Sequence, residues 1–154
     1  MGEKEAQRQP VPHARATLAY QMLPGDANSQ GYVHGGSVVK LADTAAGVCA
    51  ARHARCRVAT VAITGMTFTS PVKIGALVTV EARLVGVGRT SMQIDVEVWA
   101  EEITSGERVL TSTGRFVFVA LDDESRPATV PPLDITAHHH SERSEESLLD
   151  ADDE

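Results

Sequence analysis

The sequence predicts an α+β domain in which one central helix is wrapped by an antiparallel sheet of five to six strands. Three observations lead to this class. A single long helical segment lies in the first third of the chain, strand-like alternation fills most of the later part of the domain, and turns of only a few residues join the later strands. Short turns favour antiparallel neighbours. One helix and one curved sheet bury their apolar faces most economically against each other.

The first half of the domain is expected to contain one strand and the helix. The strand is predicted at residues 14–23 and ends at Pro24-Gly25, and a polar loop follows over 25–33. The helix is predicted from Gly35 to about His53. Its apolar residues wrap nearly all the way round, which is typical of a helix buried in a core.

The second half alternates between apolar and polar residues, as strands do. Four strands are predicted, at residues 58–69, 76–86, 90–102 and 107–121. The Pro-rich segment at residues 122–133 is expected to run over the surface.

The 154-residue chain is expected to hold one domain, at residues 12–133, between disordered ends at 1–11 and 134–154. The formal net charge is −7, but seven acidic residues and one basic residue lie within 141–154, so the remainder is nearly neutral. A nearly neutral domain argues against a nucleic-acid or anionic-membrane surface. A histidine triplet at 138–140 beside this acidic tail is interpreted as solvated, not as a metal site.

One carboxylate, Asp43, lies inside the apolar run of the predicted helix. Burying a charge is expensive unless it is paired or used. Gly35-Gly36 opens the same helix, where backbone N–H groups lack intrahelical partners and suit a developing oxyanion. Asn28 and His34 flank this turn. From the residues alone, Asp43 fits either a catalytic carboxylate or an acceptor of a structural hydrogen bond.

Several blocks of the sequence together resemble one family. The run Asn28-x-x-Gly31-x-x-His34-Gly35-Gly36, followed by Leu41-Ala42-Asp43, is similar to the active-site segment of hotdog-fold acyl-CoA thioesterases. Similarity to the acyl-CoA hydrolase branch is also found at residues 65–72, 87–91 and 115–122. The resemblance covers roughly residues 14–133. His34 before the two glycines is closer to the phenylacetyl-CoA thioesterase-like branch, because the acyl-CoA hydrolase branch often has Phe there.

The resemblance implies hydrolysis of acyl-CoA thioesters, in lipid metabolism, to free CoA and a carboxylic acid. Asp43 would act as general base on a water or attack the thioester carbonyl itself. Asn28 would position the water or the thioester, and the Gly36 N–H would polarise the carbonyl oxygen. His34 would be a further donor or would brace the turn. CoA takes part only as a portion of substrate and product, and no metal or other cofactor is implied.

The nucleotide end of CoA needs phosphate contacts, for which a Gly-rich turn with an arginine is well suited. The expected CoA contacts are Arg89, Gly88, Thr90, Ser70 and Lys73. Arg89 is the first candidate and Lys73 the second, and the alternative is that Arg89 is an ordinary solvated turn residue. Thr60 and Thr64 are further candidates for orienting water if they face the helix.

Two other functions are compatible with the same fold. The first alternative is a non-catalytic acyl-CoA-binding or sensing module, although a sensor would usually carry a DNA-binding segment for which this chain has no room. The second is a dehydratase acting on acyl-carrier protein, which needs a histidine base and an acid across the dimer. Release of free CoA separates hydrolysis from binding alone.

A lone five-stranded sheet exposes a strand edge that proteins tend to cover. The resemblance implies a homodimer that pairs two sheets across a two-fold axis, so that Asn28 of one chain meets Asp43 of the other, with three dimers possible in a hexamer. Cys49 and Cys56 are seven residues apart, too far for a disulfide on one helix. With no secretory signal and no apolar run of ~20 residues, we expect a cytoplasmic protein.

Overall fold

The computed structural model describes residues 14–133, which form one long helix, a short 3-10 helix and five strands. The elements are β1 (Arg15–Gln21), η1 (Pro24–Asp26), α1 (Gly35–Ala54), β2 (Arg57–Phe68), β3 (Leu77–Val87), β4 (Ser91–Glu101) and β5 (Arg108–Leu121). All strand pairs are antiparallel, in the order β1-β3-β4-β5-β2. The predicted disordered ends and the histidine triplet lie outside the described residues.

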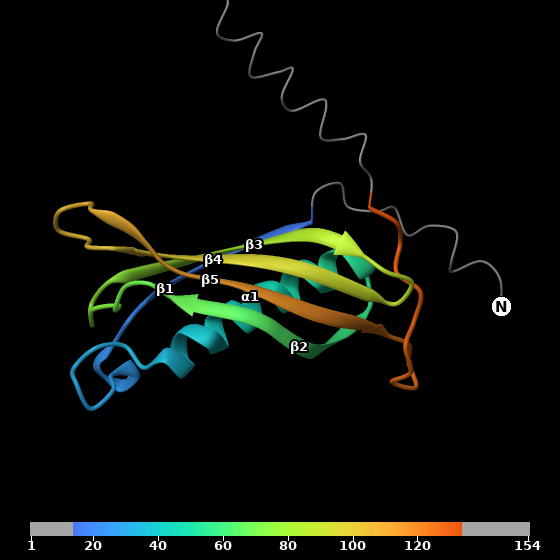
Figure 1. Cartoon of the computed structure of the whole chain (residues 1–154), viewed down its shortest axis with the longest axis horizontal. Coiled ribbons are helices and arrows are strands. Elements are labelled where there is room, and N and C mark those ends of the chain that lie inside the picture. The colour runs from blue at the N-terminus through green and yellow to red at the C-terminus, as the bar shows by residue number, and fades with distance from the viewer. Residues whose placement is uncertain (1–13, 134–154) are drawn as a thin grey trace, which may run out of the picture.

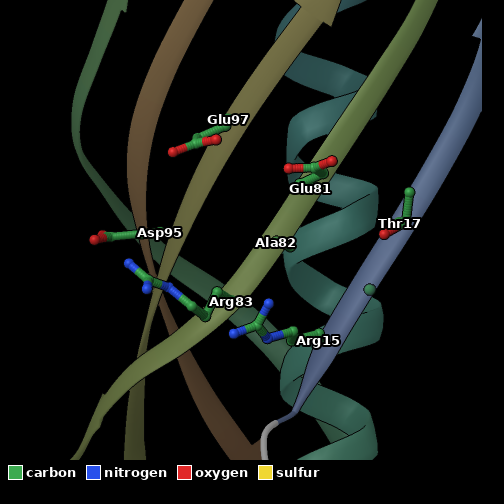
Figure 2. A pocket seen from close by; sticks show the side chains of 8 residues that line it. Arg15, Thr17, Glu81, Ala82, Arg83, Asp95 and Glu97 are labelled. Carbon is green, nitrogen blue, oxygen red and sulfur yellow. The ribbon is translucent and has the colours of Figure 1, made fainter. Parts of the chain in front are cut away.

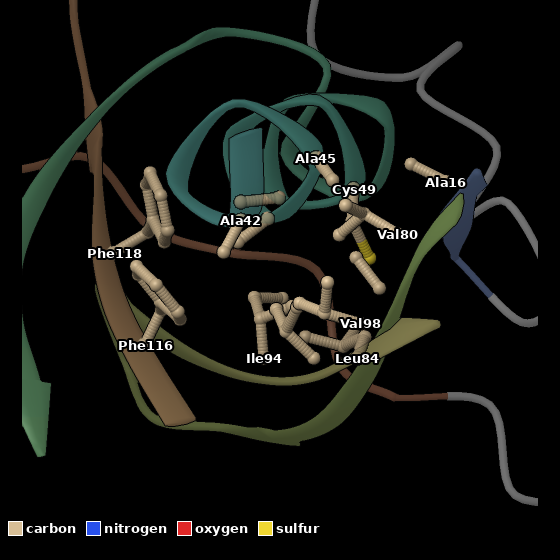
Figure 3. Packing of buried hydrophobic residues seen from close by; sticks show 14 of the residues in the cluster. Ala16, Ala42, Ala45, Cys49, Val80, Leu84, Ile94, Val98, Phe116 and Phe118 are labelled. Atoms are coloured by element: carbon tan, nitrogen blue, oxygen red, sulfur yellow. The ribbon is translucent and has the colours of Figure 1, made fainter. Parts of the chain in front are cut away.

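The sheet curves around α1, and its concave face forms the core with one side of the helix (Figures 1 and 3). The helix contributes small side chains, which allow the strands to approach closely: Ala42, Ala45, Ala46, Cys49 and Ala50. The sheet contributes larger ones, including Val80, Ile94, Val98, Phe116 and Phe118. This is the predicted hotdog arrangement of one helix within a five-stranded sheet.

The strand alternation read from the sequence matches the burial of β4. Met92, Ile94, Val96 and Val98 are buried, and the residues between them face outward. The predicted strand ends differ from the observed ones by at most two residues. Hydrogen bonds decide where a strand ends, and composition reports them only indirectly.

Two expectations about burial are wrong. The helix is not buried all round, because the sheet covers one side only and Val48 remains 42% exposed. The segment after β5 is not simply a surface segment, since Val130 is buried with 5% exposed. Within residues 14–133, no helix is both long and apolar enough to cross a membrane.

Candidate active site

The N-terminal end of α1 is organised by His34. This residue is the N-cap, and its Nδ1 accepts a hydrogen bond from the Gly36 N–H at 2.9 Å. A Cβ at residue 36 would lie 2.9 Å from that nitrogen, so glycine allows the approach. Because Nδ1 accepts, the neutral ring carries its proton on Nε2. His34 therefore braces the turn and still offers a donor, while the Gly36 N–H is engaged.

The loop before the helix is held by Asn28. Its Oδ1 accepts from the N–H groups of Gln30 at 2.9 Å and Tyr32 at 3.1 Å. Its own N–H donates to the carbonyl of Tyr32 at 2.7 Å. These bonds use the acceptor side of the amide for the loop itself. The Nδ2 group remains, so Asn28 is equipped to donate a hydrogen bond to a ligand.

Asp43 lies two turns into α1 and is half-buried, so the expectation of a fully buried charge is wrong for the single chain. Its Oδ1 accepts from the Thr60 hydroxyl on β2 at 2.7 Å. Among the described residues no hydrogen bond reaches its Oδ2. Thr60 is thus the threonine beside the carboxylate, whereas the Thr64 hydroxyl turns to the backbone oxygen of Arg115 at 3.4 Å.

One chain does not bring all of these groups together. Within residues 14–133, no hydrogen bond joins Asn28 or His34 to Asp43. The helical rise puts Asp43 about 10 Å along the axis from Gly36. Asn28, His34 and Gly36 therefore form one cluster at the start of α1, and Asp43 with Thr60 forms another further along.

The turn between β3 and β4 has Arg89 and Thr90 as its two central residues. It is closed by a hydrogen bond from the Gly88 N–H to the Ser91 carbonyl at 2.8 Å. The Arg89 carbonyl accepts from the Val130 N–H at 2.9 Å, and the Thr90 carbonyl from that of Ala120 at 3.0 Å. In the described part of the chain, the N–H groups of the two central residues make no hydrogen bond. They remain available beside the exposed Arg89 side chain.

Ser70 and Lys73 lie at the other end of the sheet. Lys73 forms an isolated bridge with Tyr32 beside the start of α1, whereas the Arg89 turn lies beside the last residues of β5 (Figure 1). Ser70 and Lys73 line a groove of about 660 Å³ whose other walls include Ile74, Ile103, Val109, Glu101, Glu102 and Glu107. Three carboxylates in this groove weaken the case for a phosphate there. The predicted CoA contacts thus separate into two groups within one chain.

A second hollow, of about 340 Å³, lies on the outer face of β1, β3 and β4, and Figure 2 shows its charged lining. Arg15 and Arg83 are directly opposed across β1 and β3, and Glu81 and Glu97 across β3 and β4. Asp95 pairs with Arg115 at 2.6 Å, and this hydrogen-bonded guanidinium lowers the pKa of the Asp95 carboxyl. None of the predicted site residues lines this hollow.

Comparison with known proteins identifies the same family as the sequence resemblance. The model of the thioesterase superfamily matches residues 30–107, about half of the chain. An uncharacterized acyl-CoA thioester hydrolase of Zymomonas mobilis is 45% identical over 126 residues, which cover 82% of this chain and 85% of the relative. The acyl-CoA thioester hydrolase YciA of Escherichia coli is 36% identical over 124 residues, covering 79% and 94% of the two chains.

Solved structures agree with these relatives. A hexameric acyl-CoA thioesterase superposes with a TM-score of 0.78 at 29% identity, covering 91% of this chain and 96% of that one. An acyl-CoA hydrolase of Staphylococcus aureus, solved with butyryl-CoA and CoA, superposes with a TM-score of 0.74 at 26% identity, covering 90% of each chain. Both similarities extend over nearly the whole described domain.

Proposed function

The chain belongs to the thioesterase superfamily and is an acyl-CoA thioester hydrolase of the hotdog fold, and from this premise we propose that Asp43 is its catalytic carboxylate. The observation that carries the proposal is the 2.7 Å hydrogen bond from Thr60, which orients the carboxylate through Oδ1 and leaves Oδ2 for a reactant. A base within reach of a water is what thioester hydrolysis requires.

Two chemical roles for Asp43 are compatible with this geometry. As general base, Oδ2 takes a proton from a water whose oxygen attacks the thioester carbonyl, and the CoA thiolate leaves and is then protonated. As nucleophile, Oδ2 attacks the carbonyl, expels the thiolate and forms an anhydride that water hydrolyses. One turnover in ¹⁸O-water tests for the nucleophilic route, because only water attack at the Asp43 carbon of an anhydride places ¹⁸O in the enzyme. Label in the acid alone is given both by direct attack of water on the thioester and by water attack at the acyl carbon of the anhydride.

Substitution of Asp43 tests the proposal directly. Asp43→Ala should lower kcat by about 10²-fold or more, since a positioned acid or base contributes about that much. Release of free CoA from acyl-CoA, followed with a thiol reagent, measures the loss. The matched control is Asp95→Ala, which removes an equally polar carboxylate from the outer face of the sheet. If Asp43→Ala retains the turnover of the control, Asp43 is a structural acceptor.

The donors at the start of α1 are proposed to hold the thioester carbonyl. Asn28 contributes Nδ2 and His34 contributes Nε2, because each residue already uses its acceptor atom internally. The Gly36 N–H is proposed to polarise the carbonyl oxygen. This requires it to exchange its hydrogen bond to His34 for one to the substrate. Whether His34 favours an aromatic acyl group stays a prediction, which a panel of phenylacetyl-CoA and straight-chain acyl-CoAs tests through kcat/KM.

We propose that the active site is completed by a second copy of the chain, paired through β2. Antiparallel pairing of β2 with its copy places the Asn28 end of one chain beside the Arg89 end of the partner. Thr60, which donates to Asp43 of α1, lies on the half of β2 nearer Arg57. This half of β2 would meet the Asn28 end of the partner. Exposed apolar side chains on β2, Val61 at 57% and Ile63 at 44%, support the pairing. Three such dimers would give a hexamer like those of the similar structures.

Complementation between inactive variants tests the shared site. Asn28→Ala and Asp43→Ala are each expected to be nearly inactive. When they are co-expressed, about half of the dimers are hybrids, and each hybrid has one site with both defects and one with neither. Activity should return to about a quarter of wild type. Co-expressed Asp43→Ala and Asp43→Asn provide the control, which should show no recovery. A mixture as inactive as its parents would place both residues in one chain's site.

The Arg89 turn is proposed to bind phosphate of the CoA nucleotide. A guanidinium beside two N–H groups that make no hydrogen bond in the described residues is well suited to an anion. Arg89→Ala should raise KM for acyl-CoA about tenfold or more with little change in kcat, since a charge-assisted hydrogen bond contributes about 1.5–3 kcal/mol. KM for the pantetheine thioester, which lacks the nucleotide, should not change. Lys73→Ala, at the groove with three carboxylates, is the comparison and should have the smaller effect.

The cytoplasmic location also remains a proposal. Both cysteines, Cys49 and Cys56, are free thiols in the structure, and free thiols persist in reducing compartments. Fractionation of the expressing cells, followed by immunodetection, measures the location. Recovery with the periplasmic or membrane fraction would contradict it.

A further inference from the structure

The segment that follows β5 (residues 122–133, here the strap) folds back over the end of the sheet. A tight turn at Asp122–Arg126 reverses the chain, and the Ala128 N–H then donates to the Ala120 carbonyl on β5 at 2.8 Å. The next contact is the hydrogen bond from the Val130 N–H to the Arg89 carbonyl at 2.9 Å. The strap therefore runs from β5 to the β3–β4 turn, along the right-hand end of the sheet in Figure 1.

His53, in the last turn of α1, fastens the strap one residue further on. Its Nε2 lies 2.7 Å from the Pro131 carbonyl, and the ring is only 1% exposed. A carbonyl oxygen can only accept, so Nε2 carries the proton and Nδ1 is the unprotonated nitrogen. That Nδ1 is buried without a hydrogen-bond partner among residues 14–133. An aliphatic side chain would fill this site without leaving a buried polar atom, so the Pro131 bond is what the histidine specifically supplies.

The bond from the strap fixes the orientation of one peptide group in the Arg89 turn. The Arg89 carbonyl and the Thr90 N–H belong to the same planar trans peptide and point in opposite directions. Because the carbonyl is held toward Val130, the Thr90 N–H is directed away from the strap. Rotation of this peptide would turn the N–H inward. The strap thus controls the direction of a donor beside the Arg89 guanidinium.

We propose that His53, acting through Pro131 and Val130, is a positioning residue for the CoA-phosphate contact made by the Arg89 turn. This inference rests on the proposed function of Arg89 and adds a dependence of that contact on a residue at the far end of α1. His53 itself touches no substrate. Its role is to keep the strap seated, so that the Thr90 N–H and the Arg89 side chain bind the same phosphate.

Two pairs of variants test this. His53→Leu removes the donor, and His53→Gln restores one. Val130→Pro removes the backbone N–H, and Val130→Ala keeps it. His53→Leu and Val130→Pro should each raise KM for acyl-CoA about three- to tenfold, with kcat within about twofold and KM for the pantetheine thioester unchanged. His53→Gln and Val130→Ala should stay near wild type. An equal rise of KM for both substrates would overturn the proposal, as would no rise for either.

A double variant and an exchange measurement separate failure of this inference from failure of the proposed function. In Arg89→Ala, adding His53→Leu should raise KM by much less than it does in wild type, because both act on one contact. Full additivity would overturn the link. Hydrogen exchange of the Val130 N–H should be faster in His53→Leu, whatever Arg89 binds, and an unchanged exchange rate would also overturn it. If exchange increases but Arg89→Ala leaves KM unaltered, the phosphate role of Arg89 has failed, and the inference fails with it.

Discussion

The two edge strands of the sheet differ in whether side chains of α1 bond to the backbone groups on their outer side. β1 is seven residues long, and α1 covers its beginning. The Arg52 guanidinium donates to the Arg15 carbonyl, which points away from β3. The Cys49 thiol donates at 3.1 Å to the Ala14 carbonyl, which also accepts from the Leu84 N–H of β3 and so lies on the paired side. One side chain of the helix, Arg52, thus occupies the outer carbonyl at which another strand would otherwise begin to pair.

β2 is twelve residues long and has no such cover. Within residues 14–133, no hydrogen bond from α1 reaches its backbone, and the one hydrogen bond between the two elements is the Asp43–Thr60 pair. Two register shifts, around Val61 and Thr64, interrupt its pairing with β5. Long edges with exposed apolar side chains are normally paired with another strand. The comparison teaches that the chain covers the start of one edge by itself, whereas the edge that carries Thr60 is the one proposed above to pair with a second copy.

The largest expected effect comes from placing a charge on the open edge. If β2 pairs as proposed, Ile63→Lys should dissociate the dimer and lower kcat/KM by about 10²-fold or more, because a buried unpaired ammonium is costly and the proposed site needs both chains. Light scattering coupled to size-exclusion chromatography measures the assembly, and release of free CoA measures the activity.

The control for this substitution lies on the closed edge. Thr17→Lys places the same side chain on the outward face of β1 and should leave both assembly and kcat/KM near wild type. If Thr17→Lys dissociates the protein and Ile63→Lys does not, the roles of the two edges are reversed. If neither does, assembly does not use a sheet edge.

The sequence predicted the fold because its patterns are local. Alternation along β4, the small residues of α1 and the short turns each report a period or a chain reversal, and together they allow few architectures. Asp43 could also be located, since a carboxylate in an apolar helix is conspicuous. Its partner Thr60 was found together with Thr64 as a candidate, but only the bulge in β2 decides which of the two faces the helix.

Other parts of the site depend on contacts that no local pattern records. His34 is an exception, because bracing the turn is one of its two predicted roles and an N-cap side chain accepts a hydrogen bond from the first turn of a helix. The separation of Lys73 from Arg89 follows from strand order, which composition does not show. The sequence does not predict the strap because its prolines resemble those of a surface loop. Val130 is buried in the core cluster, on a segment held by hydrogen bonds to Ala120, Arg89 and His53, which lie far from it in the sequence.

A smaller effect is expected on stability at high pH, from the buried Cys49 thiol beside the start of β1. Burial of the thiol raises the pKa of Cys49 to about 11, from 9.0 for an ordinary cysteine. Between these values the unfolded chain loses the thiol proton and the folded chain keeps it, so stability falls as pH rises above about 9. The free energy of unfolding of wild type should fall by about 1 kcal/mol more than that of Cys49→Ala between pH 8 and pH 10.

Urea titrations at both pH values measure this difference. Cys56 is present in both proteins, so its contribution to the pH dependence cancels. Equal losses for wild type and Cys49→Ala would mean that the thiol is solvated, and that α1 does not cover the start of β1 in solution.

The smallest expected effect is that of removing the guanidinium from the β1 edge. Arg52→Ala deletes the hydrogen bond to the Arg15 carbonyl, and water can replace it because the site is exposed. The cost should be about 0.5 kcal/mol of unfolding free energy relative to Lys40→Ala, which makes the same helix substitution at an exposed position of α1 without a strand partner. Urea unfolding measures the difference, and light scattering should find the assembly unchanged. Equal stability of the two variants would mean that β1 stays unpaired because it is short and polar, so that the Arg52 guanidinium adds nothing. A new concentration-dependent association of Arg52→Ala would show the opposite, that the guanidinium is what keeps this edge from pairing.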